Sequence, residues 1–156
     1  MYVFLNIGSN LGNRRLNLSK AVAAIEKEVG YFQLSHTIES RPWGYVSDNA
    51  FLNVGMMFQT ELEPLDLLDR LQAIERQINK TPHRDDKGEY NDREIDIDIV
   101  AIDEMQIDTE RLTVPHRHLA ERSFFLEPMQ ELAPAWRHPA TGLTPAEMLS
   151  QMRSEE

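Results

Sequence analysis

Residues 92–100 read Asp-Arg-Glu-Ile-Asp-Ile-Asp-Ile-Val, and isoleucine alternates strictly with aspartate from Ile95 onward. Because successive side chains of a β-strand point to opposite faces, this pattern predicts a strand whose isoleucines face a core. Asp96 and Asp98 then share the other face, where two neighbouring carboxylates repel each other unless a cation or a shared proton relieves them. The pair is therefore a candidate site for a hard divalent cation such as Mg²⁺, which prefers oxygen ligands.

An alternative interpretation of the same strand needs no metal. Edge strands of soluble sheets often carry outward charges, which keep a second strand from pairing with them. Half-exposed strands with alternating side chains are also common. The spacing alone therefore leaves a metal site and a charged edge strand equally open, and the rest of the chain has to separate them.

Composition limits the class of protein. The chain has 156 residues, the size of one domain, which we place at 1–156. It has no cysteine, which excludes disulfides and fits a reducing compartment. The N-terminus lacks a signal-peptide pattern, and no apolar run approaches the length of a membrane span. The 26 acidic and 16 basic residues give a net charge of −10, whereas a nucleic-acid-binding surface is normally basic. We expect a cytoplasmic monomer that binds small molecules, neither nucleic acid nor membrane.

Hydrophobic periodicity predicts the order strand, helix, strand, strand, helix, strand. We expect strands at 2–7, 31–40, 51–60 and 95–102, and helices at 16–29 and 64–78. This is the order of the ferredoxin-like fold, an α+β sandwich in which a four-stranded antiparallel sheet carries two helices on one face. The other face would be open or covered by loops. Helical patterns near 123–132 and 144–152 predict a mainly helical C-terminal extension.

Two predicted loops contain residues that suit a binding site. Residues 80–92 form a long polar stretch with Lys80 and Arg84, and loops of this length are usually functional or disordered. Residues 40–49 are rich in turn formers, and Trp43 could line a pocket for a flat ring or cap the core. A carboxylate pair near several cations and an aromatic loop indicates metal–phosphate chemistry, in which metal ions bridge phosphate oxygens and Arg or Lys stabilises charge.

The positions of Arg93 and of two histidines are less clearly indicated by the pattern. Arg93 is three residues before Asp96, so strict alternation places it on the opposite face of the strand. It reaches a ligand beside the aspartates only if the strand begins irregularly near Asp92. His116 and His118 form a weak metal-ligand pattern. We expect instead that a histidine donates to phosphate or holds the loop.

Four sets of residues carry a family resemblance. They are Gly8-Ser9-Asn10-Leu11-Gly12, Phe51-Leu52-Asn53-Val54, Arg93-x-Ile95-Asp96-Ile97-Asp98-Ile99, and Leu112-Thr113-Val114-Pro115-His116 followed by Arg122-x-Phe124-x-Leu126-x-Pro128-Met129. In this order they resemble the motifs of 6-hydroxymethyl-7,8-dihydropterin pyrophosphokinases. Each motif alone is weak, but four in register over almost the whole chain are highly specific.

The resemblance implies an ATP-dependent diphosphokinase of folate biosynthesis. Such an enzyme transfers a pyrophosphoryl group from ATP to the 6-hydroxymethyl oxygen of the dihydropterin, giving AMP and the pterin diphosphate. By the same resemblance Asp96 and Asp98 would bind two Mg²⁺ ions. Catalysis would then depend on positioning and charge stabilisation, without an obvious protein nucleophile.

The resemblance also implies roles for individual residues. Arg122 would lie at the junction of the two substrates. The catalytic set would comprise Arg93, Asp96, Asp98 and Arg122. ATP would contact Gln72, Glu75, Lys80, Arg84, Arg93, His116 and Arg122. The pterin would contact Ser40, Pro42, Trp43, Phe51, Asn53, Asp96 and Phe124.

Several positions depart from the family pattern. Residues 79–84 read Asn-Lys-Thr-Pro-His-Arg where the family often has Gly-Arg-x-Arg, so Lys80 and Arg84 would replace two arginines. Lysine lacks the planar fork of arginine. Residues 90–93 read Tyr-Asn-Asp-Arg instead of Trp-Gly-Pro-Arg, and we expect the added carboxylate of Asp92 to weaken the hold of its neighbouring arginine on phosphate. Residues 115–117 read Pro-His-Arg instead of Pro-His-Pro.

Two other classes of function stay open at this point. Ferredoxin-like domains often bind small molecules without catalysis, because a fold does not fix a function. Another Mg²⁺-dependent phosphotransferase or a nuclease could use the same carboxylate pair, although the acidic net charge weighs against a nuclease. The combination of the pair with Arg93, His116 and Arg122 favours the pyrophosphokinase, because a sensor needs no metal pair with a cationic clamp.

Overall fold

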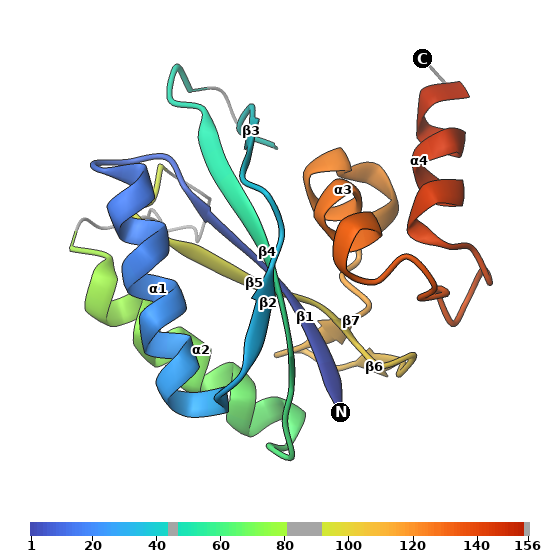
Figure 1. Ribbon diagram of the computed structural model, residues 1–156, viewed down its shortest axis with the longest axis horizontal. Coiled ribbons are helices and arrows are strands. Elements are labelled where there is room, and N and C mark those ends of the chain that lie inside the picture. Colours follow the sequence, from blue (N-terminus) through green and yellow to red (C-terminus); the bar gives the residue numbers. More distant parts are fainter. Residues whose placement is uncertain (44–46, 81–91, 155–156) are drawn as a thin grey trace.

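The computed structural model describes residues 1–43, 47–80 and 92–154. These residues form a five-stranded antiparallel sheet with helices on both faces (Figure 1). Its strands are β1 (Tyr2–Ser9), β2 (Phe32–Leu34), β3 (Ile38–Ser40), β4 (Phe51–Gln59) and β5 (Asp96–Ile102). The helices are α1 (Arg14–Val29), α2 (Pro64–Ile78), α3 (Ser123–Leu132) and α4 (Pro145–Ser154), with a short 3-10 turn at Leu119–Glu121. Two short strands, β6 (Ile107–Asp108) and β7 (Thr113–Val114), pair with each other.

The sheet has the strand order β2–β4–β1–β5, and β3 pairs with β4 beyond the end of β2. The predicted single strand over 31–40 was wrong, as was the predicted count of four strands. Leu34 pairs with Met56 and Ile38 pairs with Asn53, so three residues of one strand oppose two of the other. An extra residue of this kind breaks the ladder. Ser35 sits at the break, and its hydroxyl accepts a 2.8 Å hydrogen bond from the backbone N–H of Gly55.

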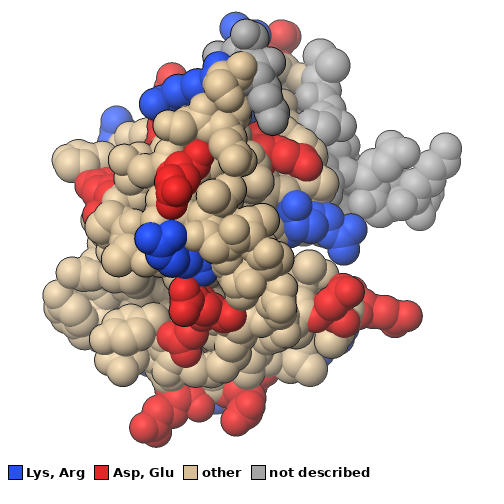
Figure 2. Space-filling view, turned by 90° about the vertical axis from the view of Figure 1, so that its right-hand side faces the viewer, with Lys and Arg blue, Asp and Glu red and all other residues tan. Residues whose placement is uncertain are grey.

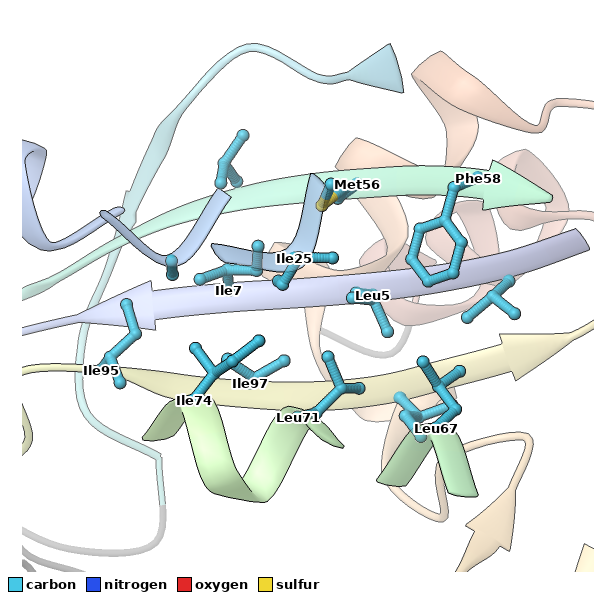
Figure 3. Close-up of a cluster of buried hydrophobic side chains, with 14 of the residues drawn as sticks. Leu5, Ile7, Ile25, Met56, Phe58, Leu67, Leu71, Ile74, Ile95 and Ile97 are labelled. Atoms are coloured by element: carbon cyan, nitrogen blue, oxygen red, sulfur yellow. The ribbon is translucent and has the colours of Figure 1, made fainter. Parts of the chain in front are cut away.

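One hydrophobic core fills the space between the sheet and helices α1 and α2 (Figure 3). The isoleucines at 95, 97 and 99 are buried in it, as the alternation predicted. Leu67, Leu71 and Ile74 of α2 pack onto them from the helix side. Asp96 and Asp98 consequently lie on the opposite face of β5.

A second core covers that opposite face, which the sequence predicted to be open or covered by loops. Helices α3 and α4 lie there instead (Figure 1). Phe125 and Met129 of α3 and Leu149 of α4 are buried against Val100 of β5. The predicted helical extension is therefore a structural layer of the sandwich.

Strand β5 contributes to both cores, and its pairing with β1 is irregular near its end. Phe4 pairs with Ala101 and Leu5 pairs with Ile99, which leaves one extra residue, Val100, in β5. The extra residue shifts the alternation by one position. Val100 and Ala101 therefore both belong to the second core, and Ile102 returns to the first.

The surface carries charges of both signs. Figure 2 shows acidic and basic side chains interspersed on the side of the molecule that lies to the right in Figure 1. Among the described residues, none of the helices combines the length and the hydrophobicity that a membrane crossing requires.

Gly55 of β4 lies close against Pro128 of α3, and its substitution is expected to lower stability. A Cβ atom on Gly55 would lie 2.6 Å from Cβ of Pro128 and 3.0 Å from Cζ of Phe4. Gly55→Ala should therefore displace α3 and reduce the free energy of unfolding by about 1–3 kcal/mol, the usual cost of overpacking a core. Denaturant unfolding followed by circular dichroism measures this loss.

Gly8→Ala is the matched control, because it adds the same methyl group to the neighbouring strand β1. There the new Cβ would meet side chains, Oδ1 of Asn53 at 3.0 Å and Cδ1 of Phe51 at 3.2 Å. Side chains adjust more readily than a packed helix, so the control should lose less stability. Equal losses in the two variants would contradict the packing argument.

Candidate active site

Two hollows share a wall formed by the start of β5 and the residues around it. The aromatic hollow is lined by Asn6, Gly8, Arg41, Phe51, Asn53 and Phe124 in addition to the shared wall. The cationic hollow is lined by residues of α2 and of 110–118, among them Arg111, His116 and Arg117. The shared wall consists of Trp43, Arg93, Asp96, Asp98 and Arg122. Ligands in the two hollows would therefore meet at the paired aspartates.

The surroundings of Asp98 disfavour its ionised form. Burial raises the pKa of Asp98 well above its ordinary value, and the charges of Asp96 and Glu75 raise it further. Arg122 and Arg93 act in the opposite direction but do not outweigh the burial. A positive charge bound at this wall would stabilise the ionised pair.

The donor set at the shared wall fits Mg²⁺. Within the described ranges, no group of three or more His, Cys, Asp or Glu side chains is placed to hold a metal by itself. Mg²⁺ does not need such a cage, because it usually takes one or two carboxylates and completes its shell with waters and substrate phosphates. Asp96 and Asp98 supply two carboxylates beside a hollow with several cationic side chains, which suits a metal ion shared with a phosphate ligand.

Arg93 lies beside Asp96 because regular alternation begins only at the first residue of β5. The backbone at 92–95 is irregular, which is the condition under which Arg93 was expected to reach the aspartates. Its side chain is only 5% exposed, and Nη1 lies 2.7 Å from Oδ1 of Asp96. Oε2 of Glu75 lies 3.5 Å from Nη2 and also accepts a 2.8 Å hydrogen bond from the N–H of Ile97. Glu75 thus orients both the guanidinium group of Arg93 and the start of strand β5.

Two asparagines fix the irregular segment before β5. Oδ1 of Asn10 accepts a 2.7 Å hydrogen bond from the N–H of Arg93, and the N–H of Asn10 donates to the Arg93 carbonyl at 3.0 Å. Asn79 binds Ile95 in the same two-point manner, with both hydrogen bonds at 2.9 Å. These contacts determine the backbone position from which the Arg93 guanidinium extends. Sequence reasoning assigned no such role to either asparagine.

His116 faces the aspartates as a neutral side chain. Its Nε2 lies 3.9 Å from Oδ1 of Asp98, and its Nδ1 accepts a 3.1 Å hydrogen bond from the N–H of His118. The neutral ring therefore carries its proton on Nε2, directed toward the shared wall. Burial lowers the pKa of His116 to about 3, and the charge of Arg122 adds to this effect. His116 can donate a hydrogen bond there without adding a charge.

The low pKa of His116 gives a pH prediction. Its ring signals in NMR spectra, assigned with His116→Gln, should stay unchanged between about pH 8 and about pH 5, since the ring is neutral throughout. Unfolding returns the pKa to 6.5, so the unfolded chain takes up a proton that the folded chain refuses. His116 should therefore contribute a loss of stability as pH falls from 6.5 toward about 3. Titration of the folded protein's His116 above about pH 5 would contradict this.

Trp43 and Arg122 form a stacked unit in the shared wall. Cζ of Arg122 lies 4.3 Å from the centroid of the Trp43 ring and 5.0 Å from that of Phe125. The ring of His118 lies 4.5 Å from the Trp43 ring, centroid to centroid. Stacking of this kind fixes the plane of a guanidinium group. Of the two fates considered for Trp43, the structure shows the pocket wall, with the side chain 40% exposed.

The aromatic hollow is shaped by a hydrogen-bonded asparagine and a glycine. Nδ2 of Asn53 donates to Oγ of Ser40 at 2.7 Å, which leaves Oδ1 directed toward Gly8. A side chain at Gly8 would occupy the space beside Oδ1 of Asn53 and the ring of Phe51. The hollow therefore presents a carbonyl oxygen between flat apolar surfaces.

The structure brings most of the predicted site residues to these hollows. The residues that line one or both are Trp43, Phe51, Asn53, Gln72, Glu75, Arg93, Asp96, Asp98, His116, Arg122 and Phe124. Ser40 supports Asn53 from behind. Pro42 and Lys80, although described, line neither hollow, and the backbone N–H of Lys80 donates to Glu94. Arg84 lies outside the described residues.

Sequence reasoning missed several residues that line the hollows. Asn6 holds the wall of the aromatic hollow by donating to the carbonyl of Phe124 at 2.8 Å. Arg111 lines the cationic hollow, and its Nη2 contacts Asp69 and Oε1 of Gln72. Arg111 directly precedes the Leu112–His116 motif, and this position was the signal in the sequence that could have identified it as a site residue.

Comparison with known proteins places these features in a family. Residues 4–134 match the family described as 7,8-dihydro-6-hydroxymethylpterin-pyrophosphokinase. The 2-amino-4-hydroxy-6-hydroxymethyldihydropteridine pyrophosphokinase of Porphyromonas gingivalis is 39% identical over 139 residues, which cover 88% of this chain and 93% of that protein. The protein of the same name from Aquifex aeolicus is 34% identical over 137 residues, covering 88% and 83%.

A solved structure shows a similar fold. The wild-type HPPK-DHPS of Plasmodium falciparum superposes with a TM-score of 0.75 at 15% identity, over 99% of this chain. This chain spans 45% of that longer protein. At this identity the likeness concerns the fold alone.

Proposed function

Because the chain belongs to the 7,8-dihydro-6-hydroxymethylpterin-pyrophosphokinase family, we infer that it is an ATP-dependent diphosphokinase of folate biosynthesis. It transfers a pyrophosphoryl group from ATP to the hydroxymethyl oxygen of 6-hydroxymethyl-7,8-dihydropterin and releases AMP. One observation of the structure supports this best: two hollows of different character share a wall that contains Asp96, Asp98 and two arginines. Transfer between two substrates requires such a meeting point, since much of the rate comes from holding the reacting atoms together.

We assign the pterin to the aromatic hollow. The flat ring would lie between Phe51 and Phe124, because aromatic faces stack on one another. Oδ1 of Asn53 would accept a hydrogen bond from a ring N–H, and Ser40 keeps this oxygen turned toward the hollow. Trp43 closes the side nearest the second substrate. Pro42, next to Trp43, would contribute through its backbone.

We assign ATP to the cationic hollow. Arg93 and Arg122 would bind the triphosphate, because a guanidinium group can donate two hydrogen bonds to one phosphate. His116 would donate a hydrogen bond from Nε2 to the phosphates while its ring stays neutral. Gln72 and Glu75 line the same hollow from α2 and would lie near the nucleotide. Lys80 and Arg84 stay proposed contacts from the polar stretch that follows α2.

We propose that Asp96 and Asp98 hold two Mg²⁺ ions together with the ATP phosphates. Bound magnesium would neutralise the phosphate oxygens and orient them for displacement. The protein's own contribution is to keep the acceptor oxygen in line with the β-phosphorus of ATP. A bond forms between these two atoms as the bond from that phosphorus to the bridging oxygen breaks, so that this oxygen leaves with AMP. The acceptor hydroxyl releases its proton to water. Arg93 and Arg122, fixed by carboxylates and aromatic rings, stabilise the charge that develops.

The remaining assignments rest on sequence and topology. We propose a ferredoxin-like plan for the first 102 residues, supported by the element order and by the strand order β2–β4–β1–β5. We also propose one domain over 1–156, a monomer and a cytoplasmic location. The predictions of no nucleic-acid partner and no membrane partner stay in place.

The test is identification of the products. The protein is incubated with Mg²⁺, ATP and 6-hydroxymethyl-7,8-dihydropterin, and the nucleotides and pterins are separated by chromatography and weighed by mass spectrometry. We expect AMP and the pterin diphosphate in equal amounts, and neither when the pterin is omitted or Mg²⁺ is chelated. ADP with a pterin monophosphate would indicate a different phosphotransferase. Binding of both substrates without turnover would indicate a non-catalytic module.

A further inference from the structure

The carboxylate of Asp92 joins its own segment to two other segments of the chain. Its Oδ1 accepts a 2.8 Å hydrogen bond from Nδ2 of Asn10, in the loop after β1. Its Oδ2 accepts hydrogen bonds from Oγ of Ser47 at 2.9 Å and from Nδ2 of Asn49 at 2.7 Å, in the segment before β4. These donors are uncharged side chains, and they bind the carboxylate to the two loops beside it.

The same contacts lead directly to Arg93. Asn10, which donates to Asp92 through its side chain, also binds the N–H and the carbonyl of Arg93. Asn10 is 3% exposed, so these hydrogen bonds are sheltered from water. The Arg93 guanidinium then reaches the shared wall at 2.7 Å from Asp96. The carboxylate of Asp92 is therefore connected to the Arg93 backbone, which carries the guanidinium group, through the single residue Asn10.

The segment at 47–49 leads into the aromatic hollow. Nδ2 of Asn10 donates a further 3.1 Å hydrogen bond to the carbonyl of Asn49, which fixes this segment a second time. β4 begins two residues later, and its first residues include Phe51 and Asn53, which line the hollow. Displacement of 47–49 would move the start of β4.

We propose that Asp92 is a positioning residue that holds the entry to the aromatic hollow and Arg93 in register with each other. This inference rests on the proposed function, in which the two hollows hold the two substrates. A carboxylate suits the role because its two oxygens can accept three hydrogen bonds at once, whereas an amide has only one accepting oxygen. The sequence alone led us to expect that Asp92 weakens the hold of Arg93 on phosphate. We now propose that Asp92 supports this hold by positioning Arg93.

The first test compares Asp92→Asn with Asp48→Asn. Both variants remove one negative charge from the same region, but Asp48 is exposed and lies outside this hydrogen-bond network. Asp92→Asn should lower kcat by about 10–100-fold, because a small displacement of a charge-stabilising group is costly in the transition state, and should raise the KM for the pterin. Its thermal midpoint should stay within about 4 °C of the parent protein. Asp48→Asn should change neither constant.

A donor–acceptor exchange separates positioning from a general structural effect. In the double variant Asp92→Asn with Asn49→Asp, the amide at 92 donates to the carboxylate at 49 and still accepts from Asn10. We expect kcat to return to within about threefold of the parent value. Asn49→Ala, at an exposed position, removes one of the three contacts and should lower kcat by a few-fold if Asp92→Asn does not fold.

The outcomes are distinct from those of the function test. If the parent protein makes no AMP, the proposed function fails. If the parent is active but Asp92→Asn matches Asp48→Asn in kcat and KM, the positioning role is overturned. It is also overturned if Asp92→Asn loses activity only in proportion to its loss of folded protein, or if the exchange variant recovers nothing.

Discussion

Asp98→Asn should reduce kcat by about 10³-fold while leaving the protein folded, and even slightly more stable. The loss follows because the variant removes a charge at the wall where both hollows meet, and electrostatic groups at such points contribute several kcal/mol to catalysis. The gain in stability follows from the raised pKa of Asp98, since burial and Asp96 both disfavour its ionised form. Asparagine has the same shape but no charge, so it avoids both the cost of burying a charge and the repulsion from Asp96.

The measurements are AMP formation under saturating substrates and thermal unfolding by circular dichroism, both near neutral pH. Asp108→Asn is the matched control, because Asp108 is exposed on β6 and lies on neither hollow. A variant Asp98→Asn that keeps more than about a tenth of the parent kcat would remove the argument for charge at this wall. Lower stability of that variant would show that the ionised carboxylate is a structural partner instead.

Arg122→Ala should have the second-largest effect, a fall in kcat/KM of about 10³-fold, similar to the loss of an arginine that stabilises a transferring phosphoryl group. Arg122→Lys should recover only part of it. Lysine keeps the charge but loses the planar fork, and with it the stacking that holds the guanidinium 4.3 Å from the Trp43 ring. Arg15→Ala is the control, since Arg15 is exposed on α1, on the opposite face of the sheet.

Arg122→Ala also has an electrostatic signature that can be measured in the folded protein. The charge of Arg122 lowers the pKa of His116 and opposes the rise in the pKa of Asp98. Its removal should raise the pKa of both groups. NMR titration of the His116 ring detects the first change. An unchanged His116 pKa, together with full activity, would place Arg122 outside the site.

The core face of β5 was predictable because the period of a strand is two and the isoleucines follow it. The sequence could not predict where regular alternation begins, because Asn10 is 83 positions away from Arg93 and a contact of that kind leaves no local pattern. Arg93 was therefore placed conditionally, and the irregular segment before Asp96 decided its position.

The layer formed by α3 and α4 shows a second reason why the sequence did not predict the whole fold. The patterns at 123–132 and 144–152 correctly predicted helices, and a helix has an apolar side wherever it packs. Which surface receives that side depends on a tertiary fit that local periodicity does not contain. Gly55 supplied part of that fit, since the absence of a side chain lets Pro128 of α3 approach β4. Likewise, the break at Ser35 depends on a hydrogen bond to Gly55, 20 residues away.

Side-chain hydrogen bonds to the backbone around the start of β5 affect how long Arg93 stays at the shared wall. The amides of Arg93 and Ile95, and that of Ile97 at the start of β5, are held by Asn10, Asn79 and Glu75 instead of by a neighbouring strand. Local opening therefore requires the loop after β1 and the C-terminal turn of α2 to let go together, and these amides should exchange their hydrogens as slowly as those of the strand that follows. The Arg93 side chain therefore stays at the shared wall only while Asn10 and the C-terminal turn of α2 both keep these hydrogen bonds.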